Sequence, residues 1–172
     1  MAQLLLTAVG ADRPGIVSSV AAKVSAHGGN WLESRMALLA GEFAGIVLVD
    51  IDDQKVEELR AGLAELAAEG LDVTVTPTRP ITPPDQTVYA VRLVGHDRPG
   101  IVSQVTGAMA GLGATIDDLD TGVRDAPMGD GVLFEAEAKV RLTSATTVDD
   151  LREALEQIAS ELMVDIEMVE AG

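Results

Sequence analysis

The sequence of 172 residues contains no cysteine, only two histidines and few aromatic residues. Without cysteine the chain forms no disulfide, no thiolate zinc site and no iron–sulfur cluster. Two histidines are too few for a histidine metal cluster, so we expect no metal and no cofactor. Aromatic residues make up 2% of the chain, which argues against a nucleic-acid surface that stacks bases on aromatic rings.

Positive charge is also scarce. Twelve Lys and Arg stand against 28 Asp and Glu, which gives a formal net charge of −16. Phosphate backbones and anionic membranes attract clustered Lys and Arg, so we expect no direct contact with nucleic acid and no membrane binding. If such a protein regulates genes, it must act through another protein.

Long apolar runs are missing as well. The longest stretch without charge, residues 99–116, contains four glycines, and the N-terminus lacks the basic start and apolar core of a signal peptide. Hydrophobic residues nevertheless make up 47% of the chain, enough for a packed core. We therefore expect a soluble, cytoplasmic protein.

The chain repeats itself. The segment VGADRPGIVS at residues 9–18 recurs as VGHDRPGIVS at residues 94–103, an offset of 85 residues. Four of the seven prolines lie between the copies at residues 77–84, a composition that cannot enter a helix or a ladder and is typical of a semi-rigid linker. We predict a duplicated domain at 1–78 and 87–172, joined by a Pro-rich linker at 79–86.

Each copy has the same predicted order of elements. Apolar β-rich runs and helical spacings alternate as strand, helix, strand, strand, helix, strand. This order is that of a ferredoxin-like α+β unit, an antiparallel sheet with helices on one face. The predicted strands are 3–9, 30–40, 42–51 and 71–76, then 87–94, 114–124, 131–142 and 164–169, with a loop through Pro127 and Gly129.

The third strand of the first copy, residues 44–51, is apolar on both faces except at Asp50. A strand of this kind is usually covered on both faces. We expect a partner chain or the other domain against its second face.

The repeated turn carries the candidate chemistry. Asp-Arg-Pro-Gly joins a first strand to a helix N-terminus, where free backbone N–H groups suit an anion such as a carboxylate. Asp12 and Asp97 can hold an ammonium group nearby, so the turn suits the two charged ends of an amino acid. The backbone groups belong to Gly15, Ile16 and Val17, and to Gly100, Ile101 and Val102.

Several interpretations of these residues stay open. Asp12 and Asp97 can instead cap the helices, with Pro-Gly shaping the turn. Arg13 and Arg98 can clamp a carboxylate or point into solvent. His96 can contact a ligand or lie solvated in the loop.

The turn and the segment that follows the first helix resemble a known family. The segment NWLESRMA at 30–37, followed by GEFA at 41–44, is similar to the tandem ACT-domain proteins of the glycine cleavage system transcriptional repressor family. The resemblance implies a small-molecule sensor whose ligand lies between paired domains and touches Asp12 or Asp97 and Asn30. The second copy departs from this pattern, because Thr115 and Ile116 replace Asn30 and Trp31.

Three functions are compatible with these features. The resemblance implies a non-catalytic regulator that binds a small amino acid, glycine first, and controls glycine cleavage or one-carbon metabolism through a protein partner such as a transcriptional activator. A ligand-free dimerisation scaffold is the second. The third, an acylphosphatase-like enzyme using Arg13, lacks the loop sequence of that class. A homodimer is left open.

Overall fold

The computed structural model describes residues 1–79, 86–127 and 131–170. The chain divides into two compact units, Met1–Thr82 and Pro83–Gly172. Residues 80–85 of the predicted linker, and Gly129 of the predicted loop, lie outside the described residues. Within the three described ranges, no helix has the length and apolar character needed to cross a membrane.

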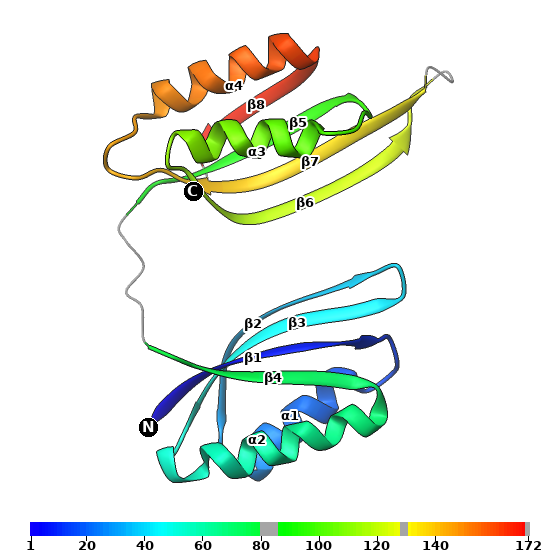
Figure 1. Cartoon of the computed structure of the whole chain (residues 1–172), viewed down its shortest axis with the longest axis vertical. Helices are drawn as coiled ribbons and strands as arrows, with labels where there is room; N and C mark the ends of the chain where they lie inside the picture. The colour runs from blue at the N-terminus through cyan, green and yellow to red at the C-terminus, as the bar shows by residue number, and fades with distance from the viewer. Residues whose placement is uncertain (80–85, 128–130, 171–172) are drawn as a thin grey trace. The chain divides into compact units, whose positions relative to one another are not determined.

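The first unit is a four-stranded antiparallel sheet in the order β2-β3-β1-β4. Both helices cover the same face of this sheet (Figure 1). Short 3₁₀ turns at Asp53–Lys55 and Glu65–Glu69 precede and follow the second helix. The elements are β1 (Ala2–Ala11), α1 (Ile16–Ala26), β2 (Asn30–Leu39), β3 (Glu42–Ile51), α2 (Val56–Ala64) and β4 (Leu71–Thr78).

The second unit repeats this topology in the strand order β6-β7-β5-β8. Its helices also lie together on one face of the sheet (Figure 1). The predicted α+β class and the two ferredoxin-like units are therefore confirmed. The elements are β5 (Val88–His96), α3 (Ile101–Gly111), β6 (Thr115–Asp125), β7 (Val132–Arg141), α4 (Val148–Leu162) and β8 (Val164–Glu170).

The core of each unit lies between the sheet and its two helices. Alternate strand residues point to the helices because successive side chains of a strand face opposite ways. Leu4 and Leu6 of β1 are 1% and 0% exposed, and burying a leucine stabilises a fold by about 1.5–3 kcal/mol. The helices contribute side chains spaced three and four residues apart, among them Ile16, Val20 and Val24 of α1 and Leu59 and Leu63 of α2.

The second face of β3 is open within the first unit. Val47 and Val49 are buried, whereas Ile46, which precedes Val47 and faces the other way, is 44% exposed. The corresponding face of β7 carries Glu137 and Lys139, which pair across the sheet with Arg92 and Ala90. The cover that we expected on the second face of β3 stays a prediction.

Pro77 departs from the prediction that residues 77–84 stay out of a ladder. It belongs to β4 and lies opposite Leu4 of β1. The physical reason is that β4 is an edge strand. An edge strand has one side without a neighbour, and proline is tolerated when its missing N–H would face that side.

Two glycines allow the first and fourth strands to approach each other. A Cβ at Gly10 would lie 2.2 Å from the carbonyl oxygen of Gly70, and a Cβ at Gly95 would lie 2.3 Å from Cγ1 of Val164. Both glycines occupy the same position of the repeat. The close approach explains why the next-to-last residue of β1 and of β5 is glycine.

We expect Gly10→Ala to lower the free energy of unfolding of the first unit by about 2–4 kcal/mol, because the new methyl group meets backbone that cannot move aside. Gly107→Ala is the matched control: its Cβ meets no atom within 4 Å, and alanine in a helix interior stabilises by about 0.5–1 kcal/mol. Urea unfolding followed by circular dichroism measures both. A neutral Gly10→Ala would contradict the close approach.

Candidate functional site

The turn after the first strand is held by the backbone in both units. Gly15 and Gly100 have φ angles of 86° and 87°, a left-handed conformation that glycine adopts at no steric cost. The N–H of Asp12 donates to the carbonyl oxygen of Gly41 at 2.9 Å, and that of Asp97 donates to Val132 at 2.9 Å. Each turn is thereby tied to the hairpin of its own unit.

No side chain caps the helix that begins at either turn. The residues that precede α1 and α3 are Gly15 and Gly100, and neither helix N-terminus receives a side-chain hydrogen bond. The interpretation of Asp12 and Asp97 as helix caps is therefore wrong. At α3 the N–H of Ile101 donates to the carbonyl oxygen of Arg98 at 3.5 Å. The other first-turn N–H groups receive no side-chain cap, and the positive end of each helix dipole favours an anion there.

The two arginines of the turns already have partners. The Arg13 guanidinium forms an ion pair with Glu69 at 2.6 Å, in the 3₁₀ turn before β4. Arg98 lies at 3.4 Å from Oε1 of Gln104 on α3. Arg13 thus holds its turn to a distant segment of the first unit, which argues against its use as an acylphosphatase-type phosphate ligand.

The other candidate residues differ in exposure. Asp12, Asp97 and His96 are exposed, and His96 ends β5. Ile16 and Ile101 are each 3% exposed, so their side chains belong to the core and only their N–H groups can contact a ligand. Of the remaining candidates, Gly15 and Gly100 are exposed and Val17 and Val102 are 43% and 39% exposed.

Asn30 lies at the other end of the sheet from Asp12. It begins β2 opposite Asp50, which lies opposite Gln3 near the start of β1. Asp12 follows the end of β1. At a rise of about 3.3 Å per strand residue, the eight residue-to-residue steps from Gln3 to Ala11, the last residue of β1, already span roughly 26 Å. The structure therefore does not bring Asp12 and Asn30 of one copy together.

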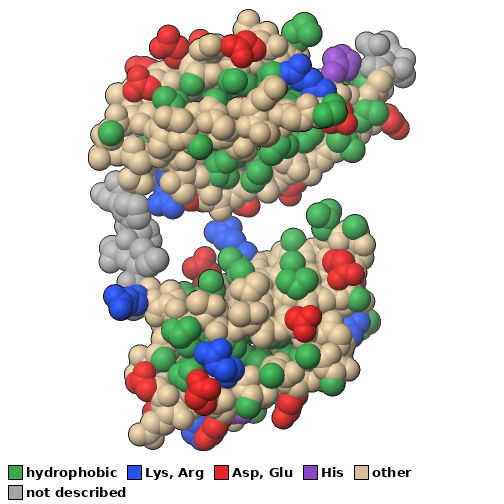
Figure 2. All heavy atoms as spheres, in the orientation of Figure 1, with side chains coloured by type: hydrophobic (Ala, Val, Ile, Leu, Met, Phe, Trp, Pro, Cys, Tyr) green, Lys and Arg blue, Asp and Glu red, His purple; other side chains and the backbone are tan. Residues whose placement is uncertain are grey.

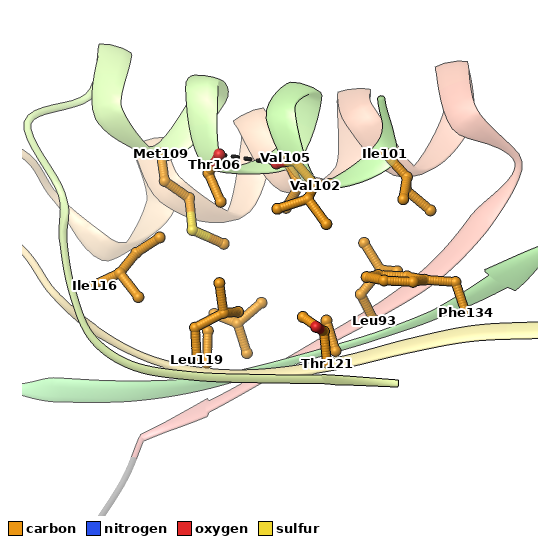
Figure 3. A pocket seen from close by; sticks show the side chains of 13 residues that line it. Leu93, Ile101, Val102, Val105, Thr106, Met109, Ile116, Leu119, Thr121 and Phe134 are labelled. Carbon is orange, nitrogen blue, oxygen red and sulfur yellow. Dashed lines mark hydrogen bonds between the residues drawn. The ribbon is translucent and has the colours of Figure 1, made fainter. Parts of the chain in front are cut away.

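An apolar pocket lies between α3 and the sheet of the second unit (Figure 3). Side chains from α3, β6 and β7 point into it (Figure 3). The hydroxyl of Thr106, one of its two threonines, donates to the carbonyl oxygen of Val102 at 2.8 Å. Its volume is about 20 Å³, close to one water-sized sphere. The labelled residues around it are Leu93, Ile101, Val102, Val105, Thr106, Met109, Ile116, Leu119, Thr121 and Phe134.

An apolar groove occupies the equivalent place in the first unit, between α1 and β2. Six of its lining residues correspond to pocket residues of the second unit at the offset of 85. The first unit has Trp31, Ser34 and Met36 on the strand side, where the second unit has Ile116, Leu119 and Thr121. The six are Val17, Ala21, Val24, Trp31, Ser34 and Met36.

Carboxylates dominate the charged surface. In the face drawn in Figure 2, acidic side chains are scattered over each unit among fewer Lys and Arg, and the basic side chains form no broad patch on that face. Within the described part of the chain, no group of three or more His, Cys, Asp and Glu side chains is arranged to hold a metal ion.

Both units match one protein family. Residues 2–76 and residues 89–169 each match the family model of the ACT domain. The two matches cover most of the chain and fall on the two ferredoxin-like units. The chain therefore belongs to the ACT-domain family and carries two ACT domains in tandem.

Individual relatives extend this result. The glycine cleavage system transcriptional repressor of Escherichia coli K12 is 35% identical over 107 residues, which are 60% of this chain and 55% of the repressor. The match thus spans about half the length of that curated relative. A solved structure from Galdieria sulphuraria, described as an unknown protein, has a TM-score of 0.84, 29% identity and 99% coverage of both chains.

Sequence reasoning missed two features of the site. The ion pair of Arg13 joins residues 56 positions apart, and nothing in the local sequence indicates it. The separation of Asp12 from Asn30 could have been predicted from the sequence. The 11-residue helix between them is about 16 Å long at 1.5 Å per residue, so it carries the two residues apart.

Because Asp12 caps nothing, we expect Asp12→Ala to change the free energy of unfolding by less than about 0.5 kcal/mol. Thr147→Ala is the comparison, since Thr147 and Asp150 form a reciprocal capping box at the start of α4. Loss of that cap costs about 1 kcal/mol. Urea unfolding of both variants tests this, and equal losses would show that Asp12 has a structural role.

Proposed function

We propose that this tandem ACT protein is a non-catalytic regulator that binds a small amino acid, with glycine as the first candidate. The observation that carries the proposal is the helix N-terminus of α1, which no side chain caps and which lies beside the exposed carboxylate of Asp12. The name of the E. coli relative supports glycine cleavage as the process under control.

The turn supplies what the two ends of an amino acid require. The ligand carboxylate accepts hydrogen bonds from N–H groups at Gly15 to Val17, where the helix dipole is positive. The Asp12 carboxylate holds the ammonium group. Gly15 has no side chain to block the approach, since a Cβ there would meet nothing within 4 Å. In the second unit, the turn at Gly100 to Val102 and Asp97 has the same composition, with His96 beside it.

Asn30 joins such a site only from a second copy of the chain. It offers one donor and one acceptor through its amide, but roughly 26 Å separate it from the turn of its own copy. We propose that the protein acts as a homodimer for this reason. The second unit has Thr115 at the equivalent position, so the first unit is the better candidate for the site.

The regulatory output passes through a protein partner, such as a transcriptional activator, in the cytoplasm. A net charge of −16 disfavours direct binding to DNA phosphates. The amino acid then changes the affinity of the chain for its partner, and the partner controls glycine cleavage or one-carbon genes.

A ligand-free interaction scaffold is the second candidate function. The exposed apolar face of β3, with Ile46 at 44% exposure, favours it because soluble proteins rarely leave such a face uncovered. The two functions differ in one measurable property, since a scaffold binds no amino acid.

We expect glycine to bind the full chain and Asp12→Ala to weaken this binding about tenfold or more, because the ammonium group loses its charged partner. Asp97→Ala should weaken it less. Isothermal titration calorimetry measures each, with Glu156→Ala on α4 as a control for lost charge. Equal losses in the two turn variants would indicate two equivalent sites, and no loss in either would exclude the turns as ligand sites.

We expect no specific complex of the purified protein with DNA from a glycine cleavage promoter at moderate salt. A DNA-binding partner alone should form a complex with this DNA. Adding this protein to that complex should change its mobility. An electrophoretic mobility shift assay measures both. A sequence-specific band formed by this protein alone would contradict action through a partner.

A further inference from the structure

The connection between α2 and β4 lies beside the turn that follows β1. Strands β1 and β4 pair antiparallel and the last pair of their ladder is Gly10 with Leu71, so the end of β1 and the start of β4 share one end of the first unit (Figure 1). Beyond this pair the Arg13 guanidinium meets the Glu69 carboxylate at 2.6 Å. The ion pair therefore joins the two connections at the point where the ladder has ended.

Glu69 ends a 3₁₀ turn that is itself held in place on two sides. Leu66 of this turn is 1% exposed and belongs to the core. Glu65, the first residue of the turn, forms an ion pair with Lys23 of α1. Because the turn is fixed to the core and to α1, Glu69 is a rigid anchor for the Arg13 side chain.

The turn that contains Arg13 has a second attachment. The N–H of Asp12 donates to the carbonyl oxygen of Gly41 at the tip of the β2–β3 hairpin. Since β1 lies between β3 and β4 in the sheet, the hairpin and Glu69 hold the turn from opposite sides. The candidate N–H groups begin at Gly15, so the segment that presents them is fixed on both sides before it enters α1.

We propose that Arg13 is a positioning residue for the amino-acid site and that it acts through Glu69. The inference rests on the proposed function, because it concerns the same N–H groups at Gly15 to Val17. A turn that is already held loses less conformational freedom when a ligand orders it, and the ligand binds more tightly for that reason. By linkage, a bound ligand stabilises the ion pair by the same factor, so it also stabilises the connection between α2 and β4.

The second unit has no equivalent of this ion pair among its described residues. Arg98, at the position of Arg13, lies at 3.4 Å from Gln104 of α3, the helix that its own turn begins. Only Met163 separates α4 from β8, so no 3₁₀ turn supplies a carboxylate there. The turn at Asp97 is tied to its hairpin, but Arg98 adds a contact within α3 alone. The first unit therefore has the better-held turn.

The size and sign of the expected effect separate positioning from direct contact. The side chains of Arg13 and Glu69 are 31% and 53% exposed, and ion pairs of this exposure change an equilibrium constant by up to about fivefold. If Arg13 instead contacted the ligand carboxylate, Glu69 would compete with the ligand for the guanidinium. Removal of Glu69 would then tighten binding, whereas the positioning role predicts that it weakens binding.

The test is a double-mutant cycle on the full chain, with glycine binding measured by isothermal titration calorimetry. We expect R13Q and E69Q each to weaken binding about two- to fivefold. The double variant R13Q/E69Q should bind no more weakly than either, because each single change removes the same ion pair. R152Q on α4 controls for lost charge, since Arg152 also pairs with a carboxylate, that of Asp149 at 3.2 Å.

Amide hydrogen exchange followed by NMR tests the ion pair without any ligand. The N–H groups of Asp12 and Gly70 each donate to a backbone carbonyl, one on either side of the ion pair. We expect R13Q and E69Q to speed both exchange rates about two- to fivefold, and the charge swap R13E/E69R to restore them. Added glycine should slow the exchange at Gly70 in the wild type and not in R13Q.

The outcomes separate this inference from the proposed function. Glycine binding that R13Q and E69Q leave unchanged, that E69Q tightens, or that the two changes weaken additively would overturn the positioning role alone. A chain that binds no glycine would overturn the proposed function. The exchange rates of the unliganded protein would then still decide whether Arg13 holds the turn, and rates that neither variant changes would overturn that as well.

Discussion

The turn between the first strand and the first helix is built from backbone, and the rest of each unit depends on it. A left-handed glycine turns the chain into the helix, and the N–H of Asp12 or Asp97 fastens the turn to the hairpin. Because main-chain groups do this work, the side chains of the turn are not needed as caps. The same geometry therefore fixes the fold and leaves N–H groups and a carboxylate available for a ligand.

The two units share the same turn and sheet topology, but their surfaces differ. Gly10 and Gly95 preserve the same close approach of the first and fourth strands, so the topology of the two units is equal. The open sheet faces of the two units differ. The first unit presents Ile46 and Leu48 on this face, whereas the corresponding positions of β7 in the second unit are Glu137 and Lys139. The sequence offset of 85 would instead match Ile46 and Leu48 with Gly131 and Leu133. The same topology thus carries an apolar open sheet face in the first unit and a charged one in the second.

Patterns of short range predicted most of the fold. Periods of two and of three to four residues gave the elements, and the repeated ten-residue segment gave the duplication. The sequence could not indicate that Pro77 joins a ladder, because the edge position of β4 follows from the order of strands. The partner of Arg13 was equally hidden, since Glu69 is 56 residues away. The site was predicted as a set of residues, but its assembly required the register of β1, β2 and β3.

The register also changes what kind of site the turn can be. Helix α1 runs from the turn at Asp12 to the start of β2, so the two ends of one helix carry the two polar candidates of the first unit. A single copy offers an anion site at one end and an amide at the other. In the homodimer that we propose, Asn30 of a second copy completes the turn at Asp12, so a ligand there contacts both copies and its binding free energy adds to that of the dimer. Under this proposal an amino acid is sensed by a change in association, without any need for a change inside either domain.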